Sequence, residues 1–282
     1  MITFNLVTCD HSKLNSATKY GSILTYHAIG ERGCLAPNVQ VSFERDTNFE
    51  AYEKLDGMNA RIIITPDFRY VIGSREELLH ADGDTIISEK DGAVRALKPH
   101  AERIRGVCKD LHDGIRDTAS STGIKLRDYE PDMVTVIFGE VFGGNIRGFK
   151  QYTGKKALGF RVFDACKIHN ISELLKRSRE DIASNWRERE KGQQFFSTTE
   201  LKNLCQVMQL EMVPRVKTDP LPTGLKDTYE WLKRAITKTH VRLDDGAKAN
   251  SEGLVIRTSD RRLIAKIRHK DYEKTEKKGF KK

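Results

Sequence analysis

A lysine, a carboxylate and a glycine stand together in the segment Lys54-Leu55-Asp56-Gly57, directly before an isoleucine-rich run. A polar β-turn is one interpretation, because Asp can hydrogen-bond its own backbone and Gly tolerates positive φ. The other interpretation is that the turn presents Lys54 as a nucleophile, since a lysine amine that has lost its proton can attack a phosphate. The four residues alone are compatible with both interpretations.

Further charged residues stand at the ends of predicted strands, as Lys54 does. They are Arg75, Glu140, Glu252, Lys266 and Arg268. Each one alone is most simply a surface charge. Together they match the needs of a bound nucleotide, because cations neutralise phosphates and carboxylates accept ribose hydroxyls and bind metal ions. A nucleotide site at the strand ends is therefore the hypothesis that these residues favour.

The elements that must position these residues are short apolar segments. Residues 59–65 and 69–72 predict a strand, a turn and a second strand. Residues 133–138 are continuously apolar, which is typical of a buried strand. Residues 254–258 and 263–267 flank a polar turn and predict another hairpin.

Between these strands the pattern becomes helical. Hydrophobic residues recur at helical spacing from Ile171 to Trp186 and again over residues 225–236, and Thr198 or Thr199 is suited to cap a helix through Glu200. The sequence therefore predicts an α+β chain with its helices grouped in an insert near residues 171–240. Because we find no internal repeat and no clear linker, residues 1–282 are expected to form a single domain.

The net charge is +9 at pH 7 and the isoelectric point is about 9.2. A basic balance of this size suits a polyanionic partner, because lysine and arginine neutralise phosphates and release counterions. The excess is concentrated after Lys266, so residues 269–282 are expected to form a short basic tail. A solvated, frayed tail would have the same composition.

Five cysteines, odd in number and widely scattered, argue against a disulfide framework and for a reducing compartment. The longest apolar run near a motif, residues 133–138, is far shorter than the roughly 20 residues that span a bilayer. The N-terminus lacks the basic and apolar regions of a secretion signal. An intracellular, cytoplasmic protein is expected, with no membrane partner and with viral or bacterial origin left open.

Taken in order, these segments resemble the motifs of the covalent nucleotidyltransferases, the superfamily of DNA ligases, RNA ligases and mRNA capping enzymes. The matching segments are Glu53–Asn59, Ser74-Arg75, Phe138–Glu140, Phe160–Asp164, Ser251–Ile256 and Ala265–Arg268. Their order and spacing carry the resemblance, which extends from about residue 50 to the end of the chain.

Within the superfamily the chain is most similar to the RNA ligase branch typified by the second RNA ligase of T-even bacteriophage and the trypanosome RNA-editing ligases. Asn59 stands where DNA ligases and capping enzymes usually carry arginine, and Phe160–Asp164 resembles the F-x-x-F-D motif of that branch. Asp56 departs from the bacteriophage pattern, which has histidine there, and follows the wider superfamily. That departure leaves a DNA-joining activity open.

The resemblance implies a ligase-type nucleotidyltransferase domain of antiparallel sheets with flanking helices. It implies that Lys54 attacks the α-phosphate of ATP with Mg²⁺ or Mn²⁺ present, that the resulting lysyl-AMP passes AMP to a 5′-phosphate, and that a 3′-hydroxyl then seals the strand. The other implied roles are Phe163 on adenine, Glu53 and Asn59 beside base and sugar, Arg75 and Glu140 on the ribose, Glu252 on the metal, and Lys266 and Arg268 at the α-phosphate. Asp56 either binds metal or only shapes the turn.

The implied partner is RNA, as a nicked duplex or broken ends, and the implied state is a monomer. A capping guanylyltransferase using GTP and a DNA ligase are the rival enzymes, and a non-catalytic RNA-binding protein on the same scaffold is the rival from another class. Family members commonly carry a further domain after the last motif. Only fourteen residues follow Arg268 here, so no separate C-terminal domain is expected, and the chain is expected to be a minimal ligase or a fragment.

Overall fold

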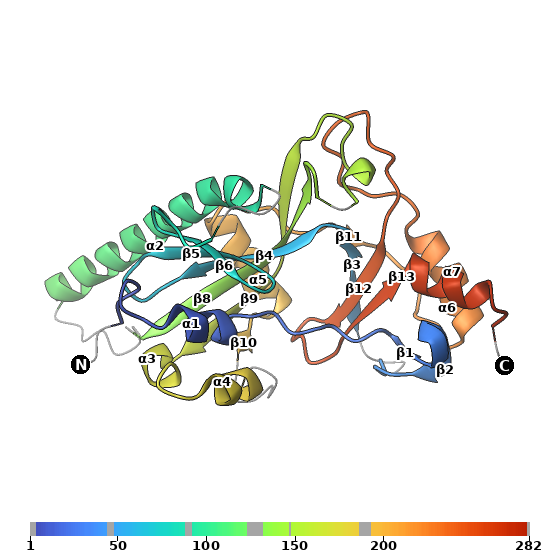
Figure 1. The fold of residues 1–282 in the computed structure, drawn as a ribbon, viewed down its shortest axis with the longest axis horizontal. Coiled ribbons are helices and arrows are strands. Elements are labelled where there is room, and N and C mark those ends of the chain that lie inside the picture. The colour runs from blue at the N-terminus through green and yellow to red at the C-terminus, as the bar shows by residue number, and fades with distance from the viewer. Residues whose placement is uncertain are drawn as a thin grey trace.

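A computed structural model of the chain describes residues 4–43, 48–87, 92–122, 132–146, 148–185 and 193–280. Its main elements are two antiparallel sheets of seven and four strands, with helices packed against them (Figure 1). Within the described ranges, no helix combines the length and apolar composition that a bilayer span needs. The α+β fold class predicted from the sequence is confirmed.

The larger sheet has the strand order β10-β9-β8-β4-β5-β6-β7. Its strands are β4 (Met58–Ile64), β5 (Tyr70–Ser74), β6 (Leu78–Ala81), β7 (Asp84–Thr85), β8 (Met133–Gly143), β9 (Leu158–His169) and β10 (Gln194–Phe195). The isoleucine-rich run forms the central strand β4. Ile62 and Ile64 join one hydrophobic cluster and Ile63 joins another, because successive side chains of a strand point to opposite faces. A strand buried on both faces is mostly apolar; the buried exception in β4 is Arg61, which is 0% exposed and donates hydrogen bonds to Asn15 and to the backbone carbonyl of Arg75.

Helices cover both faces of this sheet (Figure 1). Leu97 and Ala101 of α2 (Ala93–Thr122) and Leu201 of α5 (Thr198–Val207) pack in the cluster that contains Ile62. Helices α1 (His11–Ala17), α3 (Ile171–Leu174) and α4 (Arg179–Asn185) contribute to the cluster on the opposite face. The sheet is thereby fixed between two apolar layers.

The smaller sheet has the order β11-β3-β12-β13. Its strands are β3 (Phe49–Lys54), β11 (Arg215–Val216), β12 (Gly253–Thr258) and β13 (Ile264–Arg268). Helices α6 (Leu225–Ala235) and α7 (His269–Glu276) cover it, with Trp231 and Tyr272 packed against Leu254. A small sheet of β1 (His27–Ile29) and β2 (Leu35–Val39), joined through the 3₁₀ turn η1 (Glu31–Gly33), lies beside these helices (Figure 1).

The buried carboxylate of Asp164 joins the two sheets. Asp164 lies on β9 and is 0% exposed. It accepts a hydrogen bond from the hydroxyl of Tyr20 at 2.9 Å, one from Nη1 of Arg257 on β12 at 3.4 Å, and one from Nε of Arg261, in the turn after β12. We call these four residues the inter-sheet clasp. Because both arginines belong to the smaller sheet, the clasp fixes how the two sheets meet.

The structure differs from the sequence-based expectations in several places. The N-cap of α5 is Ser197, which forms a capping box with Glu200, and not Thr198 or Thr199. Helix α2, which contains Pro99, was not predicted. The segment 171–240 contains the expected helices and also two short strands, β10 and β11, at the edges of the two sheets; its residues 186–192, including Trp186, lie outside the described ranges. The expected basic tail forms helix α7, which buries Tyr272 and Thr275, because one face of this charged segment is apolar enough to pack.

Replacing Asp164 by Asn should lower the free energy of unfolding by about 3–5 kcal/mol, because Arg257 and Arg261 then lose their buried counter-charge. Urea unfolding followed by circular dichroism measures the loss. The matched control is Arg262→Gln, which breaks an exposed pair with Asp260 in the same turn and should cost under about 1 kcal/mol. Equal losses in the two variants would contradict the role given to Asp164.

Candidate active site

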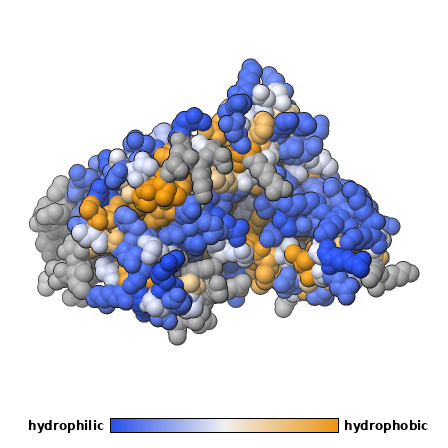
Figure 2. Space-filling view, in the orientation of Figure 1, coloured by the Kyte–Doolittle hydropathy of each residue, from blue (hydrophilic) through white to orange (hydrophobic). Residues whose placement is uncertain are grey.

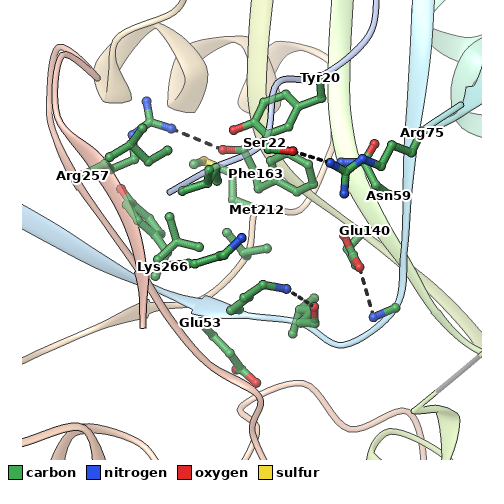
Figure 3. A pocket seen from close by; sticks show the side chains of 18 of the residues that line it. Tyr20, Ser22, Glu53, Asn59, Arg75, Glu140, Phe163, Met212, Arg257 and Lys266 are labelled. Atoms are coloured by element: carbon green, nitrogen blue, oxygen red, sulfur yellow. Dashed lines mark hydrogen bonds between the residues drawn. The ribbon is translucent and has the colours of Figure 1, made fainter. Parts of the chain in front are cut away.

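A cavity of about 520 Å³ opens between the two sheets (Figure 3). Seven residues implied by the sequence motifs line it, and they come from both sheets: Glu53, Lys54, Asn59, Arg75, Glu140, Phe163 and Lys266. A volume of this size is typical of sites for small molecules. The fold therefore brings together side chains that lie more than two hundred residues apart in the sequence.

Lys54 is the last residue of β3 and lies at the junction of the two sheets. Its backbone is opposite Gly253 of β12, which in turn is opposite Arg268 of β13. Its ammonium group donates to Oε2 of Glu252 at 2.6 Å, while Nζ of Lys270 lies 3.7 Å from the other oxygen of the same carboxylate. Glu252 thus holds the candidate nucleophile in place and is itself shared between two cations.

Glycine is required at position 57 because of close packing, and not because of the positive φ that a turn suggests. Its φ is not among the positive values in the chain. A Cβ atom at this position would lie 2.3 Å from the carbonyl oxygen of Val141 and 2.9 Å from Cγ of Glu140. Only glycine allows the chain after Lys54 to approach β8 this closely, so Gly57 sets the distance between Lys54 and Glu140.

Glu140 and Asn59 face each other across the β4–β8 pair. Oε1 of Glu140 accepts a hydrogen bond from the backbone N–H of Gly57 at 3.0 Å. Burial, with the charge of Glu252 adding to it and that of Lys54 opposing it, raises the pKa of Glu140 to about 7. Oδ1 of Asn59 is buried and has no hydrogen-bond partner within the described structure. Because unpaired buried acceptors are costly, this oxygen is suited to accept from a ligand.

Lys266 and Arg75 bring two further cations to the cavity wall. The ammonium group of Lys266 points into the cavity (Figure 3), and burial, together with the charges of Arg268 and Lys54, lowers its pKa. The backbone of Lys266 is fixed on both sides, by β12 and by hydrogen bonds with Leu24 and Tyr26 of the N-terminal segment. Arg75 follows β5 and donates to the hydroxyl of Ser22 at 2.6 Å.

Phe163 owes its position to a β-bulge. Phe138 of β8 is paired with Asp164 and the next residue, Gly139, is paired with Val162, so Phe163 is the extra residue of β9. A bulge redirects the side chain, and Phe163 lines the cavity while Asp164 enters the clasp. Phe160 belongs to the hydrophobic cluster beneath α2 instead. The two phenylalanines of the motif therefore have different surroundings.

Some residues assigned from the sequence lie elsewhere than expected. Glu53 contacts the cavity, but Oε2 of its carboxylate accepts from the backbone N–H of His240 on the other side of β3, since neighbouring strand residues point to opposite faces. Arg268 is on the same face of β13 as Lys266, but it is not part of the cavity lining and makes a two-pronged ion pair with Asp271 at 2.7 and 3.0 Å. Asp56 and Glu252 are also outside the cavity lining.

Other cavity residues were missed by sequence reasoning. Tyr20 and Ser22 belong to the segment that crosses from α1 to β1, and no motif marks this segment. Arg257 follows the segment Ser251–Ile256 directly; it is 3% exposed and donates to the backbone carbonyls of Phe163 and Phe196, both at 3.3 Å. Its position one residue after a recognised motif was the signal that could have identified it.

Among the described residues, no group of three or more His, Cys, Asp or Glu side chains is placed to hold a metal ion. Mg²⁺ in nucleotide sites, however, is commonly held by one or two carboxylates together with phosphate oxygens. Glu252, next to Lys54, fits that requirement as a single carboxylate ligand, and Asp56 is close enough to contribute to the field at Glu140.

The sequence matches a known protein family over the region that forms the site. The family model described as RNA ligase matches residues 47–270, a range that contains every site residue expected from the sequence motifs. Tyr20 and Ser22 of the cavity lie before that range. A sequence search of curated proteins finds no significant match.

Among solved structures, the chain is similar to an RNA ligase of Naegleria gruberi with PPi, with a TM-score of 0.47 and 15% identity, over 83% of this chain and 53% of that chain. A variant of that ligase with ATP and Mn gives a TM-score of 0.49 and 16% identity, over 92% of this chain and 62% of that chain. The chain thus spans 53% and 62% of the lengths of these two solved chains. Since the family model covers most of the sequence, the chain belongs to the RNA ligase family.

Proposed function

We propose that this protein is an ATP-dependent RNA ligase, which joins a 3′-hydroxyl to a 5′-phosphate through a covalent lysyl-AMP intermediate. The observation that carries the proposal is that Lys54 and Lys266, from two strands of the smaller sheet, lie at one cavity whose opposite wall carries Asn59, Glu140 and Phe163. Membership of the RNA ligase family supports it. The finer assignment, to the branch of the second T-even bacteriophage RNA ligase, is part of the same proposal.

In the first step, Nζ of Lys54 releases a proton to solvent and attacks the α-phosphate of ATP, the bond to the β-phosphate breaks, and pyrophosphate leaves. Lys54 must first exchange its contact with Glu252, at 2.6 Å, for the phosphate. Lys266 neutralises the charge that builds up on the phosphate oxygens during transfer. Arg268 adds to the positive field from two residues further along β13, although Asp271 holds its guanidinium.

The nucleoside occupies the side of the cavity formed by the larger sheet. Phe163 stacks on adenine, and the buried Oδ1 of Asn59 accepts a hydrogen bond from the base or the sugar. Glu140 and Arg75 bind the ribose. When it does so, Arg75 replaces its hydrogen bond to Ser22 with one to the ligand. Glu53 stabilises the turn through the hydrogen bond that its carboxylate accepts from the backbone N–H of His240.

A bound Mg²⁺ or Mn²⁺ would neutralise part of the phosphate charge, with Glu252 as its protein ligand and Asp56 either as a second one or as a turn residue. In the later steps AMP passes from Lys54 to the 5′-phosphate of RNA, and the 3′-hydroxyl attacks that phosphate and releases AMP. We further propose that residues 1–282 act as a single, monomeric, intracellular nucleotidyltransferase domain, with the insert near 171–240 as part of it. Nicked duplex RNA or broken ends are the proposed substrates.

The variant Lys54→Ala should take up no AMP, because it lacks the nucleophile, yet should fold normally, because Lys54 packs at the edge of the cavity and not in the core. The measurement is the intact mass of each protein after incubation with ATP and Mg²⁺. Lys226→Ala, at an exposed position on α6, is the control and should gain one AMP as the wild type does. An adduct on the Lys54→Ala protein would mean that another residue is the nucleophile.

The same mass measurement separates the rival functions. A capping guanylyltransferase would form its adduct with GTP and not with ATP. A non-catalytic RNA-binding protein would form none. Sealing of nicked duplexes with RNA or DNA on the 3′-hydroxyl side then distinguishes an RNA ligase from a DNA ligase.

The variant Phe163→Ala should need roughly tenfold or more ATP for half-maximal self-adenylylation, since aromatic stacking on a base contributes about 1–3 kcal/mol. Phe160→Ala is the matched control from the same strand. It should lower the thermal midpoint, because Phe160 is 7% exposed and packs in the core, while leaving the ATP requirement of the folded protein near that of the wild type. The reverse pattern would show that the base lies elsewhere.

A further inference from the structure

Two segments far apart in the sequence form a projecting lobe, at the top of Figure 1. They are residues 148–157, which include the 3₁₀ turn η2 (Phe149–Gln151), and residues 237–250. Backbone hydrogen bonds tie them together: Leu243 donates to Tyr152 at 2.8 Å, Lys248 to Lys150 at 2.7 Å and Ala249 to Gln151 at 3.0 Å. We call this unit the basic lobe.

The basic lobe carries six exposed cations, and its projecting tip is hydrophilic (Figure 2). They are Lys150, Lys155, Lys156, Lys238, Arg242 and Lys248. Within the described residues, no ion pair joins any of the six to a carboxylate. Some lysines elsewhere on the surface are paired with neighbouring acids, as Lys176 is with Glu173 and Lys233 with Glu230.

The two acidic residues of the lobe do little to offset this charge. Asp244 caps the backbone of the lobe, accepting from the N–H groups of Gly154 at 2.8 Å and Gly246 at 2.9 Å. Its hydrogen bonds to the backbone of Gly154 and the side chain of Thr153 lower its pKa to about 2. The carboxylate of Asp244 is thus occupied by backbone groups of the lobe. Asp245 is the other acidic residue of the lobe, against six cations.

Hydrogen bonds connect the lobe to residues on both sides of Lys54 in the sequence. The hydroxyl of Tyr152, which is 0% exposed, accepts from the backbone N–H of Asp56 at 2.6 Å. The backbone N–H of His240 donates to the carboxylate of Glu53 at 2.9 Å. One segment of the lobe therefore contacts the residue before Lys54 and the other contacts the turn after it, so a polyanion bound along the lobe leads to the candidate nucleophile.

We infer that the basic lobe binds the phosphodiester backbone of the polynucleotide whose end is brought to Lys54. The inference rests on the proposed function and adds the surface that grips the substrate. An extended polyanion fits better than a small one, because the six cations are spread over two exposed segments and do not converge in a pocket. Contacts of this kind are with phosphates and do not depend on base sequence.

The test uses the variant Lys150→Gln/Lys155→Gln/Lys248→Gln and a fluorescently labelled nicked RNA duplex. Fluorescence anisotropy should show binding about tenfold or more weaker than that of the wild type at about 0.1 M salt. The slope of log K against log salt should become shallower by about 2–3, because each of the three lysines neutralises about one phosphate. Self-adenylylation with ATP should be unchanged. Single-turnover sealing at subsaturating duplex should slow by a similar factor.

The matched control is Lys109→Gln/Arg177→Gln/Arg179→Gln, which removes three exposed cations from α2 and the α3–α4 region, away from the lobe (Figure 1). It should bind the duplex as the wild type does. Equal weakening by both variants would overturn the inference, because the effect would then be one of net charge. A raised ATP requirement for self-adenylylation in the lobe variant would also overturn it, by assigning the lobe to the nucleotide. Since anisotropy does not depend on catalysis, a protein that never forms lysyl-AMP would contradict the proposed function and leave the test of the lobe intact.

Discussion

The carboxylate of Asp164 holds together two sheets that each carry half of the candidate site. Lys54 and Lys266 belong to the smaller sheet and Glu252 directly precedes its strand β12, whereas Asn59, Glu140 and Phe163 belong to the larger sheet. Asp164 is fully buried and binds Arg257 and Arg261 across the junction. A buried charge tolerates little displacement of its partners, because each partner that moves away leaves an uncompensated ion. The clasp therefore sets the width of the cavity as well as the stability of the fold.

The bulge in β9 links the clasp directly to the cavity. Phe163 and Asp164 are neighbours, and the extra residue allows the first to face the cavity while the second faces the arginines. Arg257 completes the link, since it donates both to Asp164 and to the backbone carbonyl of Phe163. The same guanidinium thus fixes the sheet junction and the aromatic ring on which we propose that adenine stacks. The two lysines of the cavity differ in their partners. Glu252 forms an ion pair with Lys54, whereas Lys266 points into the cavity and remains available to a phosphate.

The sequence was informative where a residue's role depends on its own strand. Lys54, Asn59, Glu140 and Lys266 lie in or at the ends of short apolar strands, so their positions could be predicted from local pattern and from the family motifs. Arg268 shows the limit of that reasoning: the resemblance implies a place at the α-phosphate, but its pairing with Asp271 depends on how α7 folds back. Because residues 269–282 are strongly charged, their composition did not predict that helix.

Contacts between distant segments could not be predicted from one sequence. Tyr20 and Ser22 reach the cavity only because the segment after α1 crosses from one sheet to the other, and nothing in their local sequence marks that path. The need for Gly57 is another example. A KxDG turn suggests positive φ, but the constraint is the approach of β8, which is separated from it by about eighty residues. Packing between elements decides these features, and local propensity does not encode it.

The most direct test of this account is a crystal structure of the protein with an ATP analogue whose α,β-bridging oxygen is replaced by carbon, so that lysine cannot be adenylylated. The account predicts adenine on the face of Phe163, the α-phosphate within hydrogen-bond distance of both Lys54 and Lys266, and an unchanged Asp164 clasp. A nucleotide bound outside the cavity between the sheets, or one bound with its α-phosphate away from Lys54, would contradict it.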